Sequence, residues 1–333
     1  MSTLTYGHPR SKKFEATAVL DGNRISELPC ARLPWGSQMN KREFLSAGAA
    51  VGFGLGWDTV PEAFSQAAKW PSRAPIPHRQ AKTTRLFKAP GLYPNGLAIS
   101  PDGLWIGQQK ISAQQAALWH EPVPVDRDEA AWLVDWQGNL LKTVVTQSRN
   151  TSGMAYGDGC VWMGANADSQ GFFQTDMNSK LIRHLQIPLG PSDNGGGCHG
   201  AQWHNGKLWI VANRLRGILR VDPKTWQPEF MIPIYTTTGL SRWHDITFDN
   251  EGSLWQINGN DSTSFAEGKP GLIKYDVATG QVLETAEFIP GSCDPHGLEN
   301  HDGVLISCDA GCHPGWPDKE SPSSGYIFRI DFI

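Results

Sequence analysis

Short runs in which apolar and polar residues alternate recur five times along this 333-residue chain. In each copy a first alternating run reaches a turn that ends in glycine, and a second, more apolar run follows the turn. Two such runs joined by Asn-Gly or Asp-Gly predict a β-hairpin. The copies are YPNGLAISPDGLWIGQQ (93–109), TSGMAYGDGCVWMGAN (151–166), CHGAQWHNGKLWIVAN (198–213), RWHDITFDNEGSLWQING (242–259) and CDPHGLENHDGVLISCDAG (293–311).

The spacing of these hairpins predicts an all-β fold, a β-propeller. Aligned on the residue after the polar one that opens the first run, the copies fall at 96, 153, 200, 245 and 297, so they are 57, 47, 45 and 52 residues apart. A four-stranded blade takes about 40–50 residues. We therefore expect five four-stranded blades, each with its first strand on the central channel.

The ends of the repeat region predict how the ring closes. The last copy has only three strands before the chain ends, and the strand expected at Thr84–Lys88 has no blade of its own. Pairing this N-terminal strand with the last blade would complete it and remove an open sheet edge. A sixth, degenerate blade within 109–146 is the alternative.

The residues before the propeller predict an export signal rather than a folded domain. Residues 39–67 open with Lys41-Arg42, continue as a weakly apolar Gly/Ala-rich run and end in small residues, a pattern that resembles a twin-arginine export signal. A buried helix packed on the domain is the alternative. Because such signals begin a chain, we interpret 1–38 as a mis-called extension, 68–82 as a linker and 83–333 as the propeller. The signal predicts a periplasmic or secreted bacterial protein that has no membrane contact once the signal is removed.

Charge and cysteine content narrow the function classes. The net charge is −4, and the 29 basic residues do not cluster, so the footprint of a nucleic-acid binder is missing. The six cysteines form no CxxC pair, which argues against a zinc ribbon or a thioredoxin motif. We expect buried free thiols at Cys293, Cys308 and Cys312. The alternative, in an exported protein, is one disulfide between two of them.

One mouth of the channel is predicted to carry the chemistry. The start of the first strand and the end of the second meet at the same end of each hairpin, and all five starts are polar: Asn95, Ser152, His199, His244 and His296. Ring closure would bring His199, His244 and His296 together, and three imidazoles with an open position form a catalytic metal site. Metal-free acid–base use of these histidines and simple structural capping are the alternatives.

Other residues of this mouth are candidates for supporting roles. Asp309 would be a fourth ligand or would accept a hydrogen bond from a histidine N–H. Arg242 and Asp245 flank His244 and would hold its tautomer, meet an anionic substrate or form a surface salt bridge. Trp316 lies in the long loop 309–322, which would wall the site. The substrate-binding set is completed by the strand-end residues Asn95, Gln109, Asn166, Asn213 and Asn258.

The segments PNGLAISPDGLWIGQQ, CHGAQWHNGKLWIVAN and DPHGLENHDGVLISCDAG resemble the repeats of the streptogramin B lyase family and of gluconolactonase and NHL-type propellers. The resemblance covers about 95–333 and implies a divalent metal ion (Zn, Mn, Fe, Mg or Ca), with His296 and His244 as acid–base residues. The lyases have seven blades, and the lactonase calcium sites use Glu, Asn and Asp where this chain has mostly His, which implies a softer metal. A five-bladed ring is also similar to the bacterial and plant glutaminyl cyclotransferases.

These observations lead to one expectation with two alternatives. We expect an exported metal-dependent hydrolase or lyase that acts on a small organic ester, lactone or ether, with His296, His244 and Asp309 as its catalytic residues. A non-catalytic propeller that binds a ligand or a protein is the first alternative. A metal-dependent oxidoreductase is the second.

Overall fold

The computed structural model describes residues 75–110, 128–165, 169–190, 198–213, 215–235, 242–259, 270–310 and 325–333. The predicted extension and the predicted export signal lie outside these ranges. The described residues belong to a compact unit that runs from Arg73 to Ile333. They form strands and no helix, so none of them contributes a helix that could cross a membrane.

The described residues contain twenty strands. In chain order they are β1 (His78–Lys88), β2 (Pro94–Ser100), β3 (Gly103–Gln108), β4 (Glu129–Val134), β5 (Leu140–Thr146), β6 (Thr151–Gly157), β7 (Cys160–Ala165), β8 (Gly171–Asp176), β9 (Leu181–Leu185), β10 (Ala201–His204), β11 (Lys207–Ala212), β12 (Gly217–Val221), β13 (Pro228–Pro233), β14 (Arg242–Phe248), β15 (Leu254–Gly259), β16 (Gly271–Tyr275), β17 (Val282–Phe288), β18 (Leu298–His301), β19 (Val304–Cys308) and β20 (Tyr326–Phe332).

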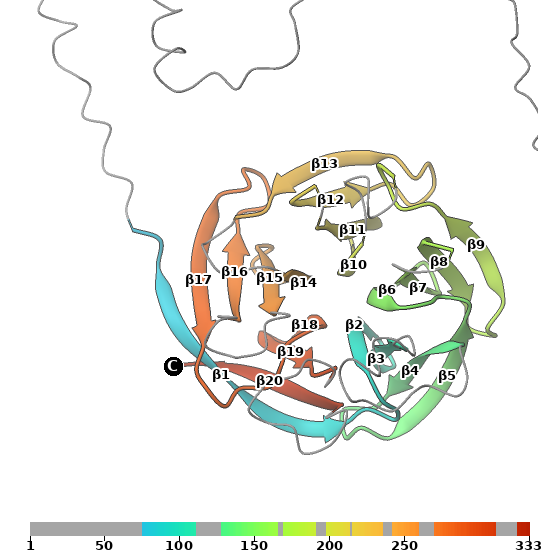
Figure 1. Ribbon diagram of the computed structural model, residues 1–333, viewed down its shortest axis with the longest axis horizontal. Coiled ribbons are helices and arrows are strands. Elements are labelled where there is room, and N and C mark those ends of the chain that lie inside the picture. Colours follow the sequence, from blue (N-terminus) through green and yellow to red (C-terminus); the bar gives the residue numbers. More distant parts are fainter. Residues whose placement is uncertain are drawn as a thin grey trace, which may run out of the picture. The chain divides into compact units, whose positions relative to one another are not determined.

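These strands form four sheets around a common centre, and every strand pair except the parallel pair β1–β17 is antiparallel (Figure 1). Three sheets have four strands each, in the orders β2-β3-β4-β5, β6-β7-β8-β9 and β10-β11-β12-β13. An eight-stranded sheet has the order β14-β15-β16-β17-β1-β20-β19-β18. The innermost strands β2, β6, β10, β14 and β18 contact one another in a closed cycle (Figure 1). This all-β arrangement is that of a β-propeller.

The strand β1 joins the two ends of the propeller sequence. It pairs antiparallel with β20 from Ala81↔Phe332 to Lys88↔Tyr326, and its first residues pair parallel with β17 from His78↔Thr285 to Ala81↔Phe288. It starts at His78, ahead of the predicted Thr84, because its early residues find backbone partners on β17. The strands β4 and β5, which lie where a sixth blade was the alternative, belong to one sheet with β2 and β3.

Three of the five predicted hairpin turns have the backbone conformation of a two-residue β-turn with positive φ. Asp158-Gly159, Asn205-Gly206 and Asp302-Gly303 have positive φ at both residues, from 50° to 87°. This combination is that of the type I′ turn, whose twist matches that of the flanking strands. The pairings Gly157↔Cys160, His204↔Lys207 and His301↔Val304 close these hairpins in register.

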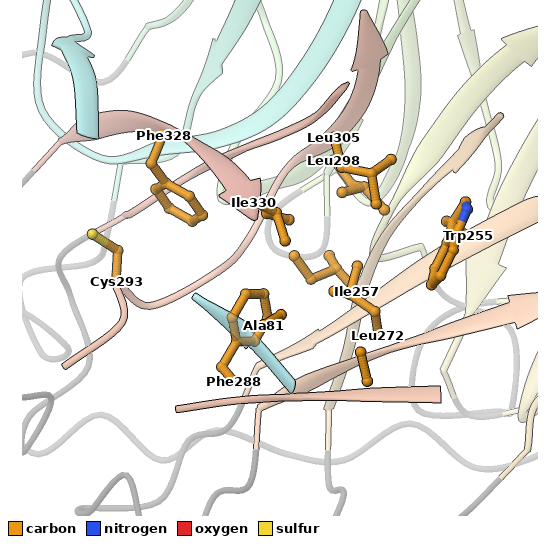
Figure 2. Packing of buried hydrophobic residues seen from close by; sticks show 11 residues of the cluster. Ala81, Trp255, Ile257, Leu272, Phe288, Cys293, Leu298, Leu305, Phe328 and Ile330 are labelled. Carbon is orange, nitrogen blue, oxygen red and sulfur yellow. The ribbon is translucent and has the colours of Figure 1, made fainter. Parts of the chain in front are cut away.

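The hydrophobic core lies between the sheets. Figure 2 shows one of its clusters, in which Ala81 of β1 packs with residues of β15, β17 and β20. The members of this cluster are Ala81, Trp255, Ile257, Leu272, Ala286, Phe288, Cys293, Leu298, Leu305, Phe328 and Ile330. Cys160, Cys198, Cys293 and Cys308 are buried free thiols.

The inner strands pack so closely that most of them carry no side chain at the point of contact. Gly96, Gly153, Gly200 and Gly297 occupy equivalent repeat positions, and a Cβ added at any of them would come within 3.0 Å of the next inner strand. At Gly96 it would lie 2.7 Å from Met154 N, and at Gly297 2.9 Å from Leu97 N. The fifth equivalent position is Asp245, which is fully buried.

We expect Gly200→Ala to lower the free energy of unfolding by about 3 kcal/mol, because the new methyl group would meet backbone atoms of His244 and Asp245 that cannot move aside. Urea unfolding measures the change. Gly206→Asn is the matched control, since Gly206 faces open space and asparagine tolerates its φ of 72°. Equal stabilities for the two variants would contradict tight packing at the axis.

We expect a chain that begins at Arg73 to unfold cooperatively, whereas a chain that begins at Ala89 loses its cooperative transition or aggregates. The shorter chain lacks β1, so it exposes the paired edges of β17 and β20 and removes Ala81 from the core. Thermal unfolding with light scattering distinguishes the two outcomes. A cooperative transition at unchanged temperature without β1 would contradict the structural role of this strand.

Candidate active site

Three imidazoles meet at one end of the inner strands. The ring centroids of His199 and His244 are 4.9 Å apart, and those of His244 and His296 are 4.2 Å apart. The exposed fractions are 9% for His199 and 1% for the other two. The structure therefore brings together the three histidines that the repeats place in register.

Backbone hydrogen bonds fix where these histidines stand. His199 N donates to Val211 O at 2.8 Å, which extends the β10–β11 ladder past the formal start of β10. His296 N donates to Cys308 O at 2.9 Å and does the same for β18 and β19. His244 lies in the register shift between Trp243 and Ile246 of β14. Each histidine is thus set by a hairpin of its own sheet.

The glycine that ends β15 makes room for the central imidazole. A Cβ added at Gly259 would come against the His244 ring and would lie 3.0 Å from Pro295 O. A side chain at this position would displace His244 from its place between the other two rings. The close approach of the second strand's end to the histidine is therefore a requirement of the site.

Asp245 connects three inner strands behind the imidazoles. Its carboxyl accepts hydrogen bonds from Ala201 N at 3.1 Å, Ile246 N at 3.0 Å and Leu298 N at 3.1 Å. Burial raises the pKa of this carboxyl well above its usual range, and the neighbouring Glu299 acts in the same direction. The residue is fully buried, so the surface salt bridge considered from the sequence is wrong.

Glu299 is a second buried carboxyl on the same axis. It accepts hydrogen bonds from Ile99 N at 3.2 Å, from Gln202 Nε2 at 3.3 Å and from Thr247 Oγ1 at 3.2 Å, which lie on β2, β10 and β14. Burial raises its pKa to about 7, although these hydrogen bonds lower it. In the sequence, only its place three residues after His296 distinguishes this carboxyl.

Two further carboxylates lie in the same repeat as His296. Asp294 Oδ2 is 3.9 Å from His296 Nδ1, so its carboxyl lies beside this ring. Asp309 is 4% exposed. Burial and, as the second cause, the negative charge of Asp309 raise the pKa of the Cys293 thiol to about 11. Asp309 N also donates to Tyr326 O at 2.9 Å, which holds it at the end of β19.

Asn95 and Gln109 are bound to each other rather than left open. Asn95 Nδ2 donates to Gln109 Oε1, and Gln109 Nε2 donates to Asn150 Oδ1. Glu129 anchors the end of this network by accepting from Lys110 N and Asn150 N, each at 2.7 Å, and burial raises its pKa to about 7. Asn95 and Gln109 thus link the first and second sheets.

The other predicted substrate-binding residues fall into two groups. Asn213 and Asn258 stand at the ends of β11 and β15, at the same mouth as His199 and His244. Asn166 and Trp316 lie outside the described residues, and only the backbone of Arg242 is described. The structure therefore places two of these five residues beside the histidines.

The types of side chain at the mouth suit a divalent metal ion, whereas the orientation of the rings does not. Imidazole nitrogens are common ligands of Zn, Fe, Mn, Cu and Ni. The rings, however, are tilted by 59° and 42° to one another. Within the described ranges no group of three or more His, Cys, Asp or Glu side chains is arranged to hold a metal ion.

The raised pKa of Glu299 predicts how stability depends on pH. Its ordinary value is near 4.5 and its folded value about 7, so the folded protein binds the proton more tightly and loses stability as pH rises through this window. Glu299→Gln should flatten the decline between pH 5 and pH 8 by roughly 2–3 kcal/mol. Urea unfolding at both pH values measures it.

Glu129→Gln provides the matched comparison, because Glu129 has the same raised pKa in a network away from the axis. It should remove a contribution of its own and leave that of Glu299. An unchanged pH dependence in Glu299→Gln would contradict a protonated carboxyl at the axis.

Comparison with one solved structure supports the fold and leaves the activity open. No protein-family model and no curated protein matches the chain. Among solved structures, Myxococcus xanthus glutaminyl cyclase is similar with a TM-score of 0.51 and 12% identity over 78% of this chain and 98% of that one.

Two other solved structures are less similar. Kuenenia stuttgartiensis hydrazine synthase has a TM-score of 0.41 and 15% identity over 67% of this chain and 57% of that one. A Bacteroides caccae protein of unknown function has a TM-score of 0.42 and 9% identity over 75% and 89%. At these identities, the likeness to the glutaminyl cyclase supports the propeller fold alone.

Proposed function

We propose that the protein is an enzyme that acts on a small organic molecule at this mouth, with His199, His244 and His296 as the ligands of one divalent metal ion. The observation that carries the proposal is the pair of centroid distances, 4.9 and 4.2 Å, between imidazoles from three different hairpins. Structural capping would require one polar group in each repeat. It would not require three imidazoles in contact.

The surroundings of the imidazoles support a catalytic role. A bound divalent ion would polarise a carbonyl group or activate water. Asp294 lies near enough to His296 to orient its ring, and Asp245 fixes the backbone on both sides of His244. In this proposal His244 and His296 also move protons, Asp309 orients the site, and Asn166, Asn213, Asn258, Arg242 and Trp316 contact the substrate.

The reaction class comes from the resemblance of the repeats. We propose hydrolysis or elimination at an ester, lactone or ether, in a periplasmic or secreted protein whose partner is a small molecule and not nucleic acid or a membrane. The scaffold of this proposal is a ring of five blades, with β1 as the outer strand of the last. The closed cycle of inner strands and the pairing of β1 with β20 support that count.

Metal-free acid–base catalysis by the same histidines is a second candidate. It is favoured by the tilted packing of the rings. Among the described residues, these side chains are not arranged as a set of metal ligands. A non-catalytic propeller that binds a ligand or a protein, and an oxidoreductase that uses Fe or Cu at these histidines, are the remaining alternatives. Metal content, absorption spectrum and activity separate the four.

We expect the purified protein to contain roughly one divalent ion per chain and His199→Ala/His244→Ala to lose it, because two of the three ligands are removed. Elemental analysis measures the content, and hydrolysis of a panel of lactones and esters measures the activity. His184→Ala/His301→Ala is the matched control, since it removes two imidazoles outside the cluster, His184 on β9 and His301 at the other end of β18.

Each result of this experiment selects one candidate. Loss of metal and activity in the first variant alone supports the proposal, and a visible absorption band would identify a redox metal instead. Activity that depends on the imidazoles in a metal-free protein selects acid–base catalysis. A metal-free protein whose ligand binding and activity do not change in either variant would leave the binding scaffold.

A further inference from the structure

Beside the imidazoles, three buried side chains of β14 and β15 share one face. Trp243 and Asn258 are partners across the two strands, so their side chains lie on the same side, and Gln256 stands two residues before Asn258 on that side. Trp243 packs with Trp209 and Val211 of β11. The shared face is therefore turned toward the sheet β10–β13.

The polar atoms of these side chains have no hydrogen-bond partner among the residues that the structure describes. They are Trp243 Nε1, Gln256 Nε2, Asn258 Oδ1 and Asn258 Nδ2, on side chains that are 6%, 0% and 0% exposed. Gln256 Oε1 accepts from the Tyr275 hydroxyl at 3.0 Å, which directs Nε2 elsewhere. Burying such groups without partners is costly, and native proteins rarely do so without a ligand or water.

These atoms border the centre of the candidate active site. Trp243 precedes His244 in β14, and Asn258 precedes Gly259, whose backbone lies against the His244 ring. Asn213 Oδ1, at the end of β11, is also buried, and no described residue is its hydrogen-bond partner. The orphaned groups thus gather where the second strand of each hairpin reaches the mouth, between the third and fourth hairpins of the chain.

We infer that Trp243, Gln256 and Asn258 form a subsite that binds an uncharged amide group of the substrate. The subsite offers three donor nitrogens and one acceptor atom, Asn258 Oδ1. An amide oxygen accepts two hydrogen bonds and an amide N–H donates one, so a single amide satisfies most of these atoms. Exchanging the oxygen and nitrogen of Asn258 does not change this match, because both atoms are orphaned.

Other polar groups match the subsite less well. A ketone, ester or ether has no donor for Asn258 Oδ1. A carboxylate also lacks the donor, and it would bury a negative charge beside Asp245 among uncharged side chains. This inference rests on the proposed function, because it assigns to the same site an amide that is held apart from the bond that reacts.

Three isosteric probes test the inference: acetamide, acetone and acetate. The indole Nε1–H resonance of Trp243, assigned by its loss in Trp243→Phe, reports the subsite directly by NMR. We expect acetamide to shift this resonance saturably, and acetone and acetate to bind at least about tenfold more weakly. An absent or non-saturable response to acetamide, or an equal response to acetone, would overturn the inference and leave a site for bound water.

Asn258→Leu separates ligand binding from a structural role. It keeps the volume and removes two unpartnered polar atoms, so we expect the acetamide response to disappear while the melting temperature is unchanged or higher. A lower melting temperature with the response retained would show that Asn258 is structural. Asn178→Leu, in the exposed turn between β8 and β9, is the matched control and should retain the response.

The acetamide response of the wild-type protein, compared with its metal content and activity, separates this inference from the proposed function. If the wild-type protein proves to be metal-free and inactive but acetamide still shifts the Trp243 resonance, the subsite stands and the proposed enzyme does not. If metal and activity are present but acetamide gives no saturable shift, the proposed function stands and the amide subsite is wrong.

Discussion

The structure depends on how closely its inner strands approach one another. Four of the five equivalent inner positions are glycine, since a Cβ there would collide with the next strand. The fifth is Asp245, whose carboxyl occupies the space that the glycines leave and accepts N–H groups from β10 and β18.

The site follows from this constraint. Each candidate histidine immediately precedes one of these positions: His199 precedes Gly200, His244 precedes Asp245, and His296 precedes Gly297. Where the backbones are forced together, the side chains one residue earlier are forced together as well. Centroid distances of 4.2 and 4.9 Å are the result, and a residue substituted at the glycine positions would separate the rings without touching them.

Local patterns in the sequence predicted the hairpins and the meeting of the histidines, whereas long-range pairings decided the rest. The turns at Asp158, Asn205 and Asp302 have the positive φ that their Gly partners imply. The early start of β1 depends on β17, about 200 residues away, so no local pattern reveals it. One feature of the sequence distinguishes Asp245, which bonds three inner strands: it is an aspartate at the position where every other repeat has glycine. The tilt of the rings depends on side-chain rotamers, which the repeats do not encode.

The distribution of polar groups separates the parts of the axis by role. Asp245 and Glu299 accept hydrogen bonds from several strands each, so removing either would leave backbone or side-chain donors unpaired. Trp243, Gln256 and Asn258 have the opposite property, because four of their buried polar atoms have no hydrogen-bond partner among the described residues. Since each orphaned group costs about 1–3 kcal/mol, the core of the propeller must offset that loss. Native proteins rarely keep such an arrangement unless a ligand or water completes it, and here these atoms lie beside the imidazoles.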